Sequence, residues 1–253
     1  MSGDHIGGQS SHVLPKARTI GRLAADPRES NVLSLRSPGA RASVERQRRT
    51  FAFSVLCVAA VAGIGAGLWL FVLRDRFVPK RFGVVIAGEV YRSGQISRHM
   101  IADVIDRYRI GTIIDLNGFD PSDPDQRAEA AVSRSKGVRH CCFPLKGDST
   151  GKIDRYADAI EALVDSQRKG IPVLVHCYAG TQRTGACISF YSLLIRREPP
   201  DKVYEELGRY GWDSRSDQVL LDYVNSHMRV LADLLVQRHV LERVPDEIPR
   251  LHP

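Results

Sequence analysis

The chain has 253 residues, enough for one ordinary domain with additional segments, and its apolar and charged fractions are those of a globular protein. Its formal net charge of +7 is unevenly distributed: residues 1–81 carry 13 Lys and Arg against 5 Asp and Glu, whereas residues 82–253 carry 23 against 24. Because the folded part is almost neutral and has no basic stripe with interleaved aromatic residues, we do not expect nucleic acid as a partner.

The first fifty residues and the apolar run after them differ sharply in composition. Residues 1–50 are rich in Ser, Gly, Arg and Pro without an apolar period, which predicts a disordered basic tail. Residues 51–73, FAFSVLCVAAVAGIGAGLWLFVL, carry no charge, and about 20 apolar residues suffice to cross a bilayer, so we predict one transmembrane helix. A core helix or a cleaved signal peptide fits less well, because the run is long and starts late.

The orientation of this single-pass helix follows only weakly from its flanks. Basic residues lie on both sides of it, and the positive-inside rule favours the N-terminus inside by a small margin. In a bacterial host, that orientation would place the following domain in the periplasm.

The pattern of a globular domain begins at residue 82 and extends to residue 240, with a C-terminal tail over 241–253. Two short strands with a turn near Ala87–Gly88 come first. Strands then alternate with amphipathic helices, and helices fill the last third. This order predicts an α/β fold with a central, mostly parallel sheet flanked by helices. The expected helices are 96–109, 120–137, 151–170, 183–198, 199–211 and 216–240, and the later strands are 111–118, 138–145 and 172–176.

The stretch HCYAGTQRTG, residues 176–185, lies between the apolar strand PVLVH and a predicted helix. A loop that enters a helix directs backbone N–H groups outward, and the helix dipole favours an anion there. Gly180 and Gly185 permit a tight loop and close packing, while Arg183 offers a planar fork of donors suited to phosphate oxygens. The same field stabilises a thiolate at Cys177, which is a strong nucleophile.

This stretch resembles the HC-x5-R-[ST]-G signature of the cysteine-based tyrosine and dual-specificity phosphatases. His176–Cys177 and Arg183–Thr184–Gly185 match its two ends, and the resemblance covers about residues 83–225. GEVYRSGQ, residues 88–95, is similar to the entry segment of atypical dual-specificity phosphatases of plants, fungi and bacteria. The resemblance implies a phosphatase fold and the hydrolysis of phosphomonoesters through a phosphocysteine.

The resemblance also implies roles for single residues. Cys177 would attack phosphorus, His176 would brace the loop and tune the thiolate, and Thr184 would steady the departing thiolate. Arg183 and the loop N–H groups would hold the phosphate oxygens without a metal or other cofactor. The residues whose N–H groups would bind substrate are Tyr178, Ala179, Gly180, Thr181, Gln182 and Arg183.

The general acid of this family is usually an aspartate some thirty residues before the cysteine. Asp148, in FPLKGDSTG, is 29 residues before Cys177 and is our choice, although an aspartate capping the helix near Lys152 explains the position almost as well. Asp120, Asp123 and Asp125 are rivals in a stretch that the prolines mark as a turn. Gln182 occupies the position before the signature arginine, where some relatives carry an aspartate, and could orient the hydrolytic water.

The loop between Cys177 and Arg183 contains no lysine. Relatives that act on inositol phosphates or phosphoinositides tend to carry additional basic residues there, so a neutral loop favours a phosphorylated protein or a small phosphate ester. Arg92 and Lys146 could add charge at the rim, which keeps the inositol phosphate and phosphoinositide alternatives open. A non-catalytic receptor for phosphorylated ligands and a rhodanese-like sulfur transferase are further alternatives, the latter disfavoured by the RTG sequence.

Overall fold

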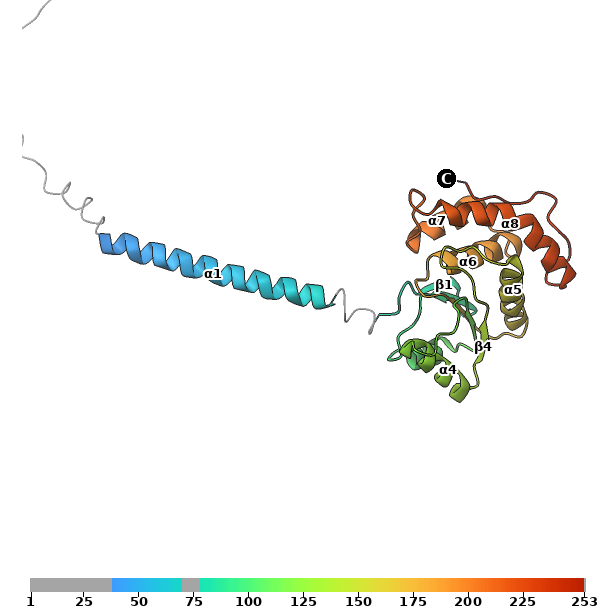
Figure 1. The fold of residues 1–253 in the computed structure, drawn as a ribbon, viewed down its shortest axis with the longest axis horizontal. Helices are drawn as coiled ribbons and strands as arrows, with labels where there is room; N and C mark the ends of the chain where they lie inside the picture. Colours follow the sequence, from blue (N-terminus) through green and yellow to red (C-terminus); the bar gives the residue numbers. More distant parts are fainter. Residues whose placement is uncertain (1–37, 70–77, 253) are drawn as a thin grey trace, which may run out of the picture. The chain divides into compact units, whose positions relative to one another are not determined.

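The computed structural model describes residues 38–69 and 78–252 (Figure 1). The chain divides into two compact units, with the boundary between residues 62 and 63. The long helix α1 and the globular domain that begins near residue 78 are therefore described separately.

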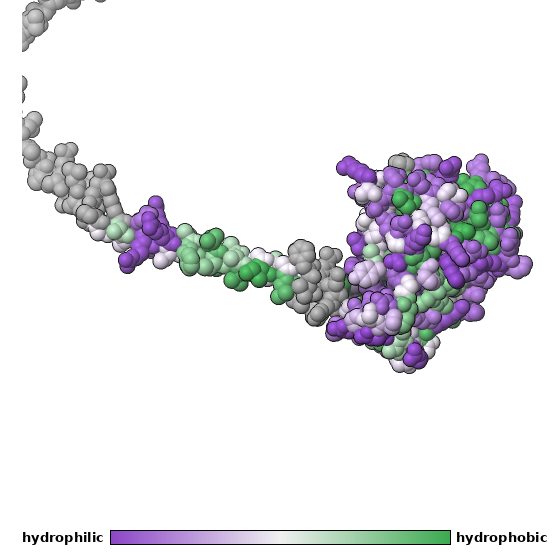
Figure 2. All heavy atoms as spheres, in the orientation of Figure 1, coloured by the Kyte–Doolittle hydropathy of each residue, from purple (hydrophilic) through white to green (hydrophobic). Residues whose placement is uncertain are grey.

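Helix α1 spans Pro38–Leu68. Its segment Ala42–Leu68 contains an 18-residue window with a mean hydropathy of 2.2, none of which is buried, so the helix is a candidate membrane span (Figure 2). At about 1.5 Å per residue the uncharged part of the helix, residues 51–68, is about 27 Å long, close to the roughly 30 Å apolar thickness of a bilayer. The sequence predicted disorder over residues 1–50, but residues 38–50 are helical. The Glu45–Arg49 ion pair at 3.3 Å stabilises this part of the helix. The rest of the predicted tail, 1–37, and residues 70–73 of the predicted span lie outside the described residues.

The sheet of the domain has five strands in the order β1-β2-β5-β3-β4. All neighbouring pairs are parallel except β1 and β2, which form the predicted entry hairpin. β5 lies between β2 and β3, so the residue that follows it emerges at the middle of the sheet edge. The strands are β1 Gly83–Ile86, β2 Val90–Ser93, β3 Thr112–Asp115, β4 Arg139–Cys142 and β5 Val173–His176.

Helices cover both faces of this sheet, as the alternating pattern predicted (Figure 1). In β5, Val173 and Val175 pack into the larger apolar cluster, whereas Leu174 between them packs into the smaller one. This alternation is the period-2 geometry of a strand buried on both faces. The helices are α3 Ile101–Tyr108 and α4 Pro124–Lys136 on one side, and α5 Ile153–Arg168, α6 Gln182–Leu194, α7 Pro200–Arg209 and α8 Gln218–Gln237 on the other.

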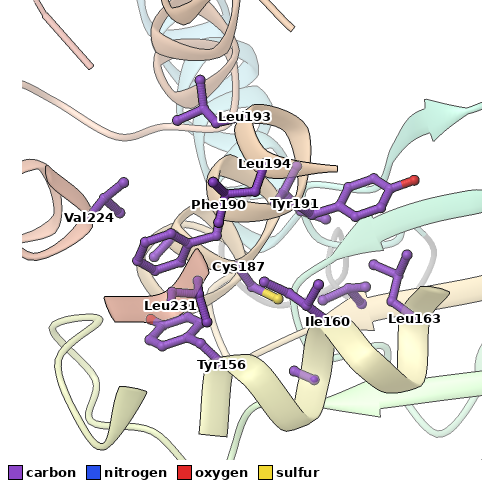
Figure 3. Close-up of a cluster of buried hydrophobic side chains, with 14 of the residues drawn as sticks. Tyr156, Ile160, Leu163, Cys187, Phe190, Tyr191, Leu193, Leu194, Val224 and Leu231 are labelled. Carbon is purple, nitrogen blue, oxygen red and sulfur yellow. The ribbon is translucent and has the colours of Figure 1, made fainter. Parts of the chain in front are cut away.

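The larger core centres on α6, the helix that follows the active-site signature. Every residue of α6 from Thr184 to Leu194 is buried. Phe190 packs edge-on against Tyr156 of α5 at a ring-centroid distance of 5.2 Å, and α8 closes the cluster from the other side (Figure 3). A helix buried all round is held by its neighbours, so the start of α6 is a firm base for the signature loop.

The globular domain extends beyond the predicted residues 82–240 at both ends. Leu251 is buried and exchanges two hydrogen bonds with the Asn225 side chain, at 2.8 and 2.9 Å, so the C-terminal segment is part of the domain. At the other end, Arg81 donates to the carbonyl oxygen of Ala179 in the signature loop. Neither segment has a regular apolar period, and each is held by a few specific contacts that a pattern search does not detect.

Replacement of Phe190 by Ala removes a fully buried ring, and we expect it to lower the free energy of unfolding by about 3–5 kcal/mol. Phe119→Ala is the matched control, because that ring is 53% exposed and its loss should cost less than about 0.5 kcal/mol. Urea denaturation of the full chain in detergent, followed by circular dichroism, measures both. Equal destabilisation by the two variants would contradict the assignment of α6 to the core.

Candidate active site

The signature loop connects the central strand β5 to the N-terminus of α6. Cys177 directly follows β5 and is 1% exposed, and Thr181 precedes the first turn of α6. The loop therefore lies at the carboxyl edge of a parallel sheet and at the positive end of a helix dipole. Both features favour binding of an anion at this place.

Three successive carbonyl groups of the loop are held by donors that lie outside it. Their oxygens accept as follows: Tyr178 from the Gln95 N–H at 3.1 Å, Ala179 from Arg81 Nη1 at 2.9 Å, and Gly180 from Arg92 Nη2 at 3.0 Å. In a trans peptide the N–H points opposite to the carbonyl, so the next N–H in each case points inward. The Gly180 N–H does donate to Cys177 Sγ, at 3.2 Å.

Two glycines allow the loop to lie directly against the end of β2. Gly180 has a φ of +78°, and a Cβ at that position would come within 2.5 Å of the Gly94 nitrogen. A Cβ on Gly94 would in turn meet the carbonyl oxygen of Ala179 at 2.9 Å. Both contacts are with backbone atoms, which cannot move aside cheaply, so neither position accepts a side chain without displacing the loop.

Arg92 braces the loop from behind and does not contribute to its rim. Its side chain is 1% exposed, forms an ion pair with Glu206 of α7 at 3.1 Å, and lies 3.9 Å from the ring centre of Tyr210. Burial lowers the pKa of the guanidinium, an effect that Glu206 partly offsets. The prediction of a rim charge at Arg92 is therefore wrong, because residues of β2 point into the interior here. Lys146 is exposed.

The Cys177 thiol is set up to ionise. Burial alone would raise its pKa, but the Thr184 hydroxyl, the Arg183 charge and the N–H groups of Thr184 and Gly180 outweigh burial and lower it. Cys142 and Cys187 show the opposite behaviour: burial raises the pKa of Cys187 to about 12, and partial burial together with the Asp115 carboxylate raises that of Cys142 to about 12. Cys177 thus differs from these two because of the loop around it.

Arg183 and Thr184 lie at the start of α6, where the signature predicted them. Arg183 Nη1 donates to the Leu116 carbonyl oxygen at 3.3 Å, which leaves its buried Nε without a partner among the described residues. A buried donor of this kind needs an acceptor, and a phosphate oxygen would supply one. The Thr184 hydroxyl lies between the sulfur and the Ser93 carbonyl oxygen, which is 3.5 Å away.

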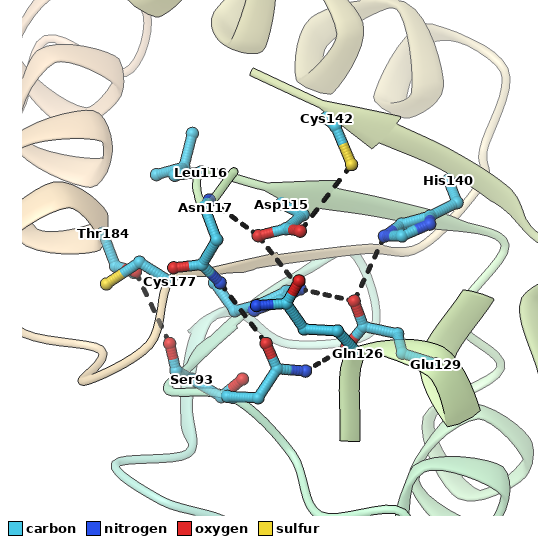
Figure 4. A network of polar contacts seen from close by, with 12 residues as sticks. Ser93, Asp115, Leu116, Asn117, Gln126, Glu129, His140, Cys142, Cys177 and Thr184 are labelled. Carbon is cyan, nitrogen blue, oxygen red and sulfur yellow. Dashed lines mark hydrogen bonds and ion pairs between the residues drawn. The ribbon is translucent and has the colours of Figure 1, made fainter. Parts of the chain in front are cut away.

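His176 belongs to a buried network of polar groups behind the loop (Figure 4). Its Nε2 lies 3.0 Å from Glu129 Oε1 and 3.9 Å from Asp115 Oδ1, and His140 Nε2 lies 3.1 Å from the same Glu129 oxygen. Burial would lower the pKa of His176, yet the two carboxylates raise it to about 9. The two carboxylates therefore favour the charged form of the imidazole.

The same four side chains form the described set that could hold a metal ion. The ligand-type atoms of Asp115, Glu129, His140 and His176 lie within 4.8 Å of one another. They already pair with each other, and the carboxylates also accept from the Gln95 amide, the Asn117 N–H and the Cys142 thiol. Such mutual pairing is what buried charges require, so we assign the set to a charge network.

Asp148 lies in the tight turn between β4 and α5. Its Oδ1 accepts from the Thr150 hydroxyl at 2.7 Å and from the Thr150 N–H at 2.9 Å, and the Thr150 hydroxyl is the main cause of its lowered pKa. The alternative of a helix cap is wrong, because α5 begins after Lys152 without a side-chain cap. As placed, Asp148 is an exposed carboxylate, and the bonds from Thr150 favour its ionised form over the protonated form that a general acid needs.

The rival aspartates all have structural partners. Asp123 is the N-cap of α4 and accepts from two backbone N–H groups of its first turn. Asp120 accepts from the N–H and hydroxyl of Ser122, and Asp125 accepts from the Arg98 N–H at 2.8 Å. These contacts agree with the interpretation of the stretch as a turn. Asp148 has contacts of the same kind with Thr150, so its choice as the general acid stays a prediction from the sequence.

Sequence reasoning missed the residues that are far from the loop in the sequence but support it in the fold. Arg81, Gln95, Asp115 and Glu129 contact the loop or His176 directly, but they come from four separate segments without a shared motif. GEVYRSGQ was recognised as an entry segment, and the Gln95 at its end was the one available signal. Glu129 is an ordinary-looking acid on a polar helix.

Gly180→Ala should displace the loop and reduce kcat/KM for a phosphate monoester on the order of 10²-fold, the loss expected from a misplacement of about 1 Å. Gly208→Ala is the matched control, because a Cβ there meets nothing within 4 Å. Steady-state kinetics on both variants tests the point. Wild-type activity of Gly180→Ala would show that the loop does not need its contact with β2.

Thr184→Val should raise the pH midpoint for alkylation of Cys177, because it removes the strongest single stabiliser of the thiolate. Mass spectrometry of the Cys177 peptide after timed iodoacetamide treatment at several pH values measures the midpoint. Cys142 should react slowly at neutral pH in the same samples, given its raised pKa. Ser189→Ala, also on buried α6, is the control; an unchanged midpoint in Thr184→Val would contradict this account of the thiolate.

Comparison with known proteins identifies the family to which this site belongs. A sequence model of the tyrosine phosphatase family matches residues 79–206. The dual specificity protein phosphatase H1 of Variola virus is 37% identical over 63 residues, and a Fowlpox virus homologue is 42% identical over 55. These matches span 24% and 21% of this chain, and only about a third of the length of the viral proteins (37% and 33%).

Solved structures share the fold of the domain at low sequence identity. The P. aeruginosa protein TpbA superposes with a TM-score of 0.50 at 20% identity, over 63% of this chain and 91% of its own. The catalytic core of Siw14 gives a TM-score of 0.53 at 14% identity, over 64% and 94%. The family match covers half of the chain and contains the whole signature loop. The chain therefore belongs to the tyrosine phosphatase family of cysteine-based phosphatases.

Proposed function

We propose that the protein is a membrane-anchored phosphatase that hydrolyses phosphomonoesters through a phosphocysteine at Cys177. The observation that carries this proposal is the set of outward-held carbonyls at Tyr178, Ala179 and Gly180. They direct the following N–H groups at a buried sulfur whose pKa is lowered. The loop N–H groups, Arg183 and Cys177 form a concave site, here called the bowl, which fits a tetrahedral anion in contact with a nucleophile.

In the first step, the Cys177 thiolate attacks phosphorus and the bond from phosphorus to the ester oxygen breaks. The loop N–H groups and the Arg183 guanidinium hold the three equatorial oxygens, whose charge is stabilised through the transition state. The unpartnered Nε of Arg183 supplies one of these donors. Asp148, in its protonated form, gives its proton to the departing oxygen.

In the second step, water attacks the phosphocysteine and Asp148 takes a proton from that water. Inorganic phosphate leaves, and the Cys177 thiolate is restored with help from the Thr184 hydroxyl. Gln182 is suited to orient the water, because its Oε1 is buried without a partner among the described residues. His176, the residue before Cys177, is anchored through its side chain to Glu129 and contributes positive charge behind the sulfur.

The composition of the bowl favours a monophosphate as substrate. Arg183 is the single cation between Cys177 and Gly185, and Arg92 is buried behind the loop. Tyr178 is 57% exposed, so it offers an aromatic surface beside the bowl. A phosphotyrosine or phosphoserine/threonine side chain or a small phosphate ester fits these features better than a highly charged inositol phosphate. One TpbA structure is described as a complex with phosphotyrosine, and Siw14 is described as a PP-IP phosphatase.

The apolar part of α1 supports anchoring of the domain at a membrane. Its length and composition suit one crossing, and a helix of this kind near an N-terminus can also act as a signal sequence. Partition of the full chain between membrane pellet and supernatant after carbonate extraction distinguishes the two. An anchored protein stays in the pellet at full length, and a cleaved one is released in a shortened form.

Cys177→Ser should abolish turnover while binding of vanadate or phosphate persists, because serine keeps the bowl but lacks the thiolate. Asp148→Asn should lower kcat by 10²–10⁴-fold, the usual contribution of a general acid, while a substrate with an activated aryl leaving group is affected least. Kinetics on phosphotyrosine peptides, phosphoserine peptides and inositol phosphates measures both effects and the substrate class. Normal turnover by Cys177→Ser would refute the mechanism.

A receptor for phosphorylated ligands is the second candidate, because the hydrogen bonds from Thr150 lower the pKa of Asp148 and so disfavour the protonated form that a general acid needs. A receptor needs the bowl but no acid. Mixing the wild-type protein rapidly with an activated aryl phosphate separates the two functions. An enzyme releases a burst of the aryl product stoichiometric with Cys177, and a receptor releases none.

A further inference from the structure

One buried carboxylate is linked to both neighbours of the nucleophile, directly to His176 and through Gln95 to Tyr178. Glu129 of α4 lies with Oε1 3.0 Å from His176 Nε2, and its Oε2 accepts from the Gln95 side-chain amide at 3.0 Å. The backbone N–H of Gln95 donates to the Tyr178 carbonyl oxygen at 3.1 Å. The residue before Cys177 and the residue after it are therefore tied to the same side chain.

We propose that Glu129 is a positioning residue of the phosphatase site, which fixes His176 directly and Tyr178 through Gln95, and so fixes the sulfur between them. The inference rests on the proposed function, since it assigns a role in that reaction. Glu129 itself touches neither the sulfur nor the substrate bowl in the contacts described.

The cost of burying this carboxylate supports a role beyond stability. Glu129 is 1% exposed and His176 is fully buried. Replacement of a buried ion pair by apolar residues of similar volume is often neutral or stabilising, so stability alone gives no reason for a charge here. His176 and His140 outweigh burial and lower the pKa of Glu129 to about 2, which keeps the carboxylate ionised at neutral pH.

The Gln95 side chain is oriented from both ends, which makes the link to Tyr178 rigid. Its amide nitrogen donates to Glu129, and its oxygen accepts from the Asn117 side chain at 3.3 Å. The Asn117 N–H in turn donates to Asp115 at 2.7 Å, and Asp115 lies beside His176 (Figure 4). The contacts form a closed ring of polar groups around the strand ends that carry the loop. A ring of this kind holds a geometry that single contacts would leave loose.

The experiment compares Glu129→Gln and Glu129→Ala with Lys136→Gln. Lys136 is on the same helix and pairs with Asp106 of α3 at 2.7 Å, so its replacement loosens α4 without touching the ring. The readouts are kcat and KM on a phosphotyrosine peptide, the dissociation constant for vanadate, and the pH midpoint of Cys177 alkylation. Glu129→Gln preserves side-chain volume, and circular dichroism confirms that each variant is folded.

We expect both Glu129 variants to lose kcat/KM on the order of 10²-fold, mainly in kcat, as misplacement of the reacting group predicts. Vanadate should bind more weakly, and the alkylation midpoint should move upward, because the N–H donors no longer converge on the sulfur. Lys136→Gln should stay within about two-fold of wild type. If Glu129→Gln matches wild type in kcat/KM and midpoint, or if Lys136→Gln loses as much, the proposal is wrong.

Gln95→Leu removes the side-chain bonds of residue 95 to Glu129 and Asn117 and keeps its backbone bond to Tyr178, so it breaks the ring while Glu129 stays paired with His176. It keeps the test decisive if a Glu129 variant fails to fold. It should lose part of the activity, and the double variant Gln95→Leu/Glu129→Gln should lose less than the product of the two single losses, because one ring is broken in both. Fully multiplicative losses, or wild-type kinetics of Gln95→Leu, would contradict the proposal. If the wild-type protein turns over no phosphate ester, the proposed function fails, while vanadate affinity and alkylation still decide the role of Glu129.

Discussion

The site depends on hydrogen bonds from outside the signature loop to three of its consecutive carbonyl oxygens. The carbonyl oxygens of residues 178, 179 and 180 accept hydrogen bonds from Gln95, Arg81 and Arg92, respectively. Because each peptide is planar and trans, every carbonyl held outside fixes one N–H pointing inward. The loop thus acquires a positive concave face without placing a lysine in it, and the thiolate of Cys177 is stabilised by dipoles that need no rearrangement during the reaction.

Much of the fold could be predicted from the sequence, because the information was local. The strand PVLVH and the helix after Arg183 are visible as an apolar run and a helical period, and both lie where expected. The family model and the structural neighbours confirm the resemblance that the HC-x5-R-[ST]-G signature indicated. The helical start of α1 at Pro38 was not expected, because residues 38–50 have the polar and basic composition of a disordered tail and no apolar period.

The supports of the site could not be predicted in the same way. Glu129 and His176 are 47 residues apart, and Arg92 and Glu206 are 114 apart, so only the folded topology brings each pair together. Arg92 illustrates the difficulty well. From sequence it was a plausible charge at the rim, yet the register of β2 turns it inward, where it becomes a brace for Gly180. A strand of four residues gives too little pattern to decide which side faces the solvent.

The most direct test of the central claim is a crystal structure of the protein with orthovanadate. Our account places vanadium on the sulfur of Cys177, with its equatorial oxygens taken by the loop N–H groups and by Nε of Arg183. The carbonyl oxygens of residues 178–180 would keep the outside donors that they have here. A loop with any of these carbonyls turned toward the sulfur, or vanadate bound away from Cys177, would contradict the account.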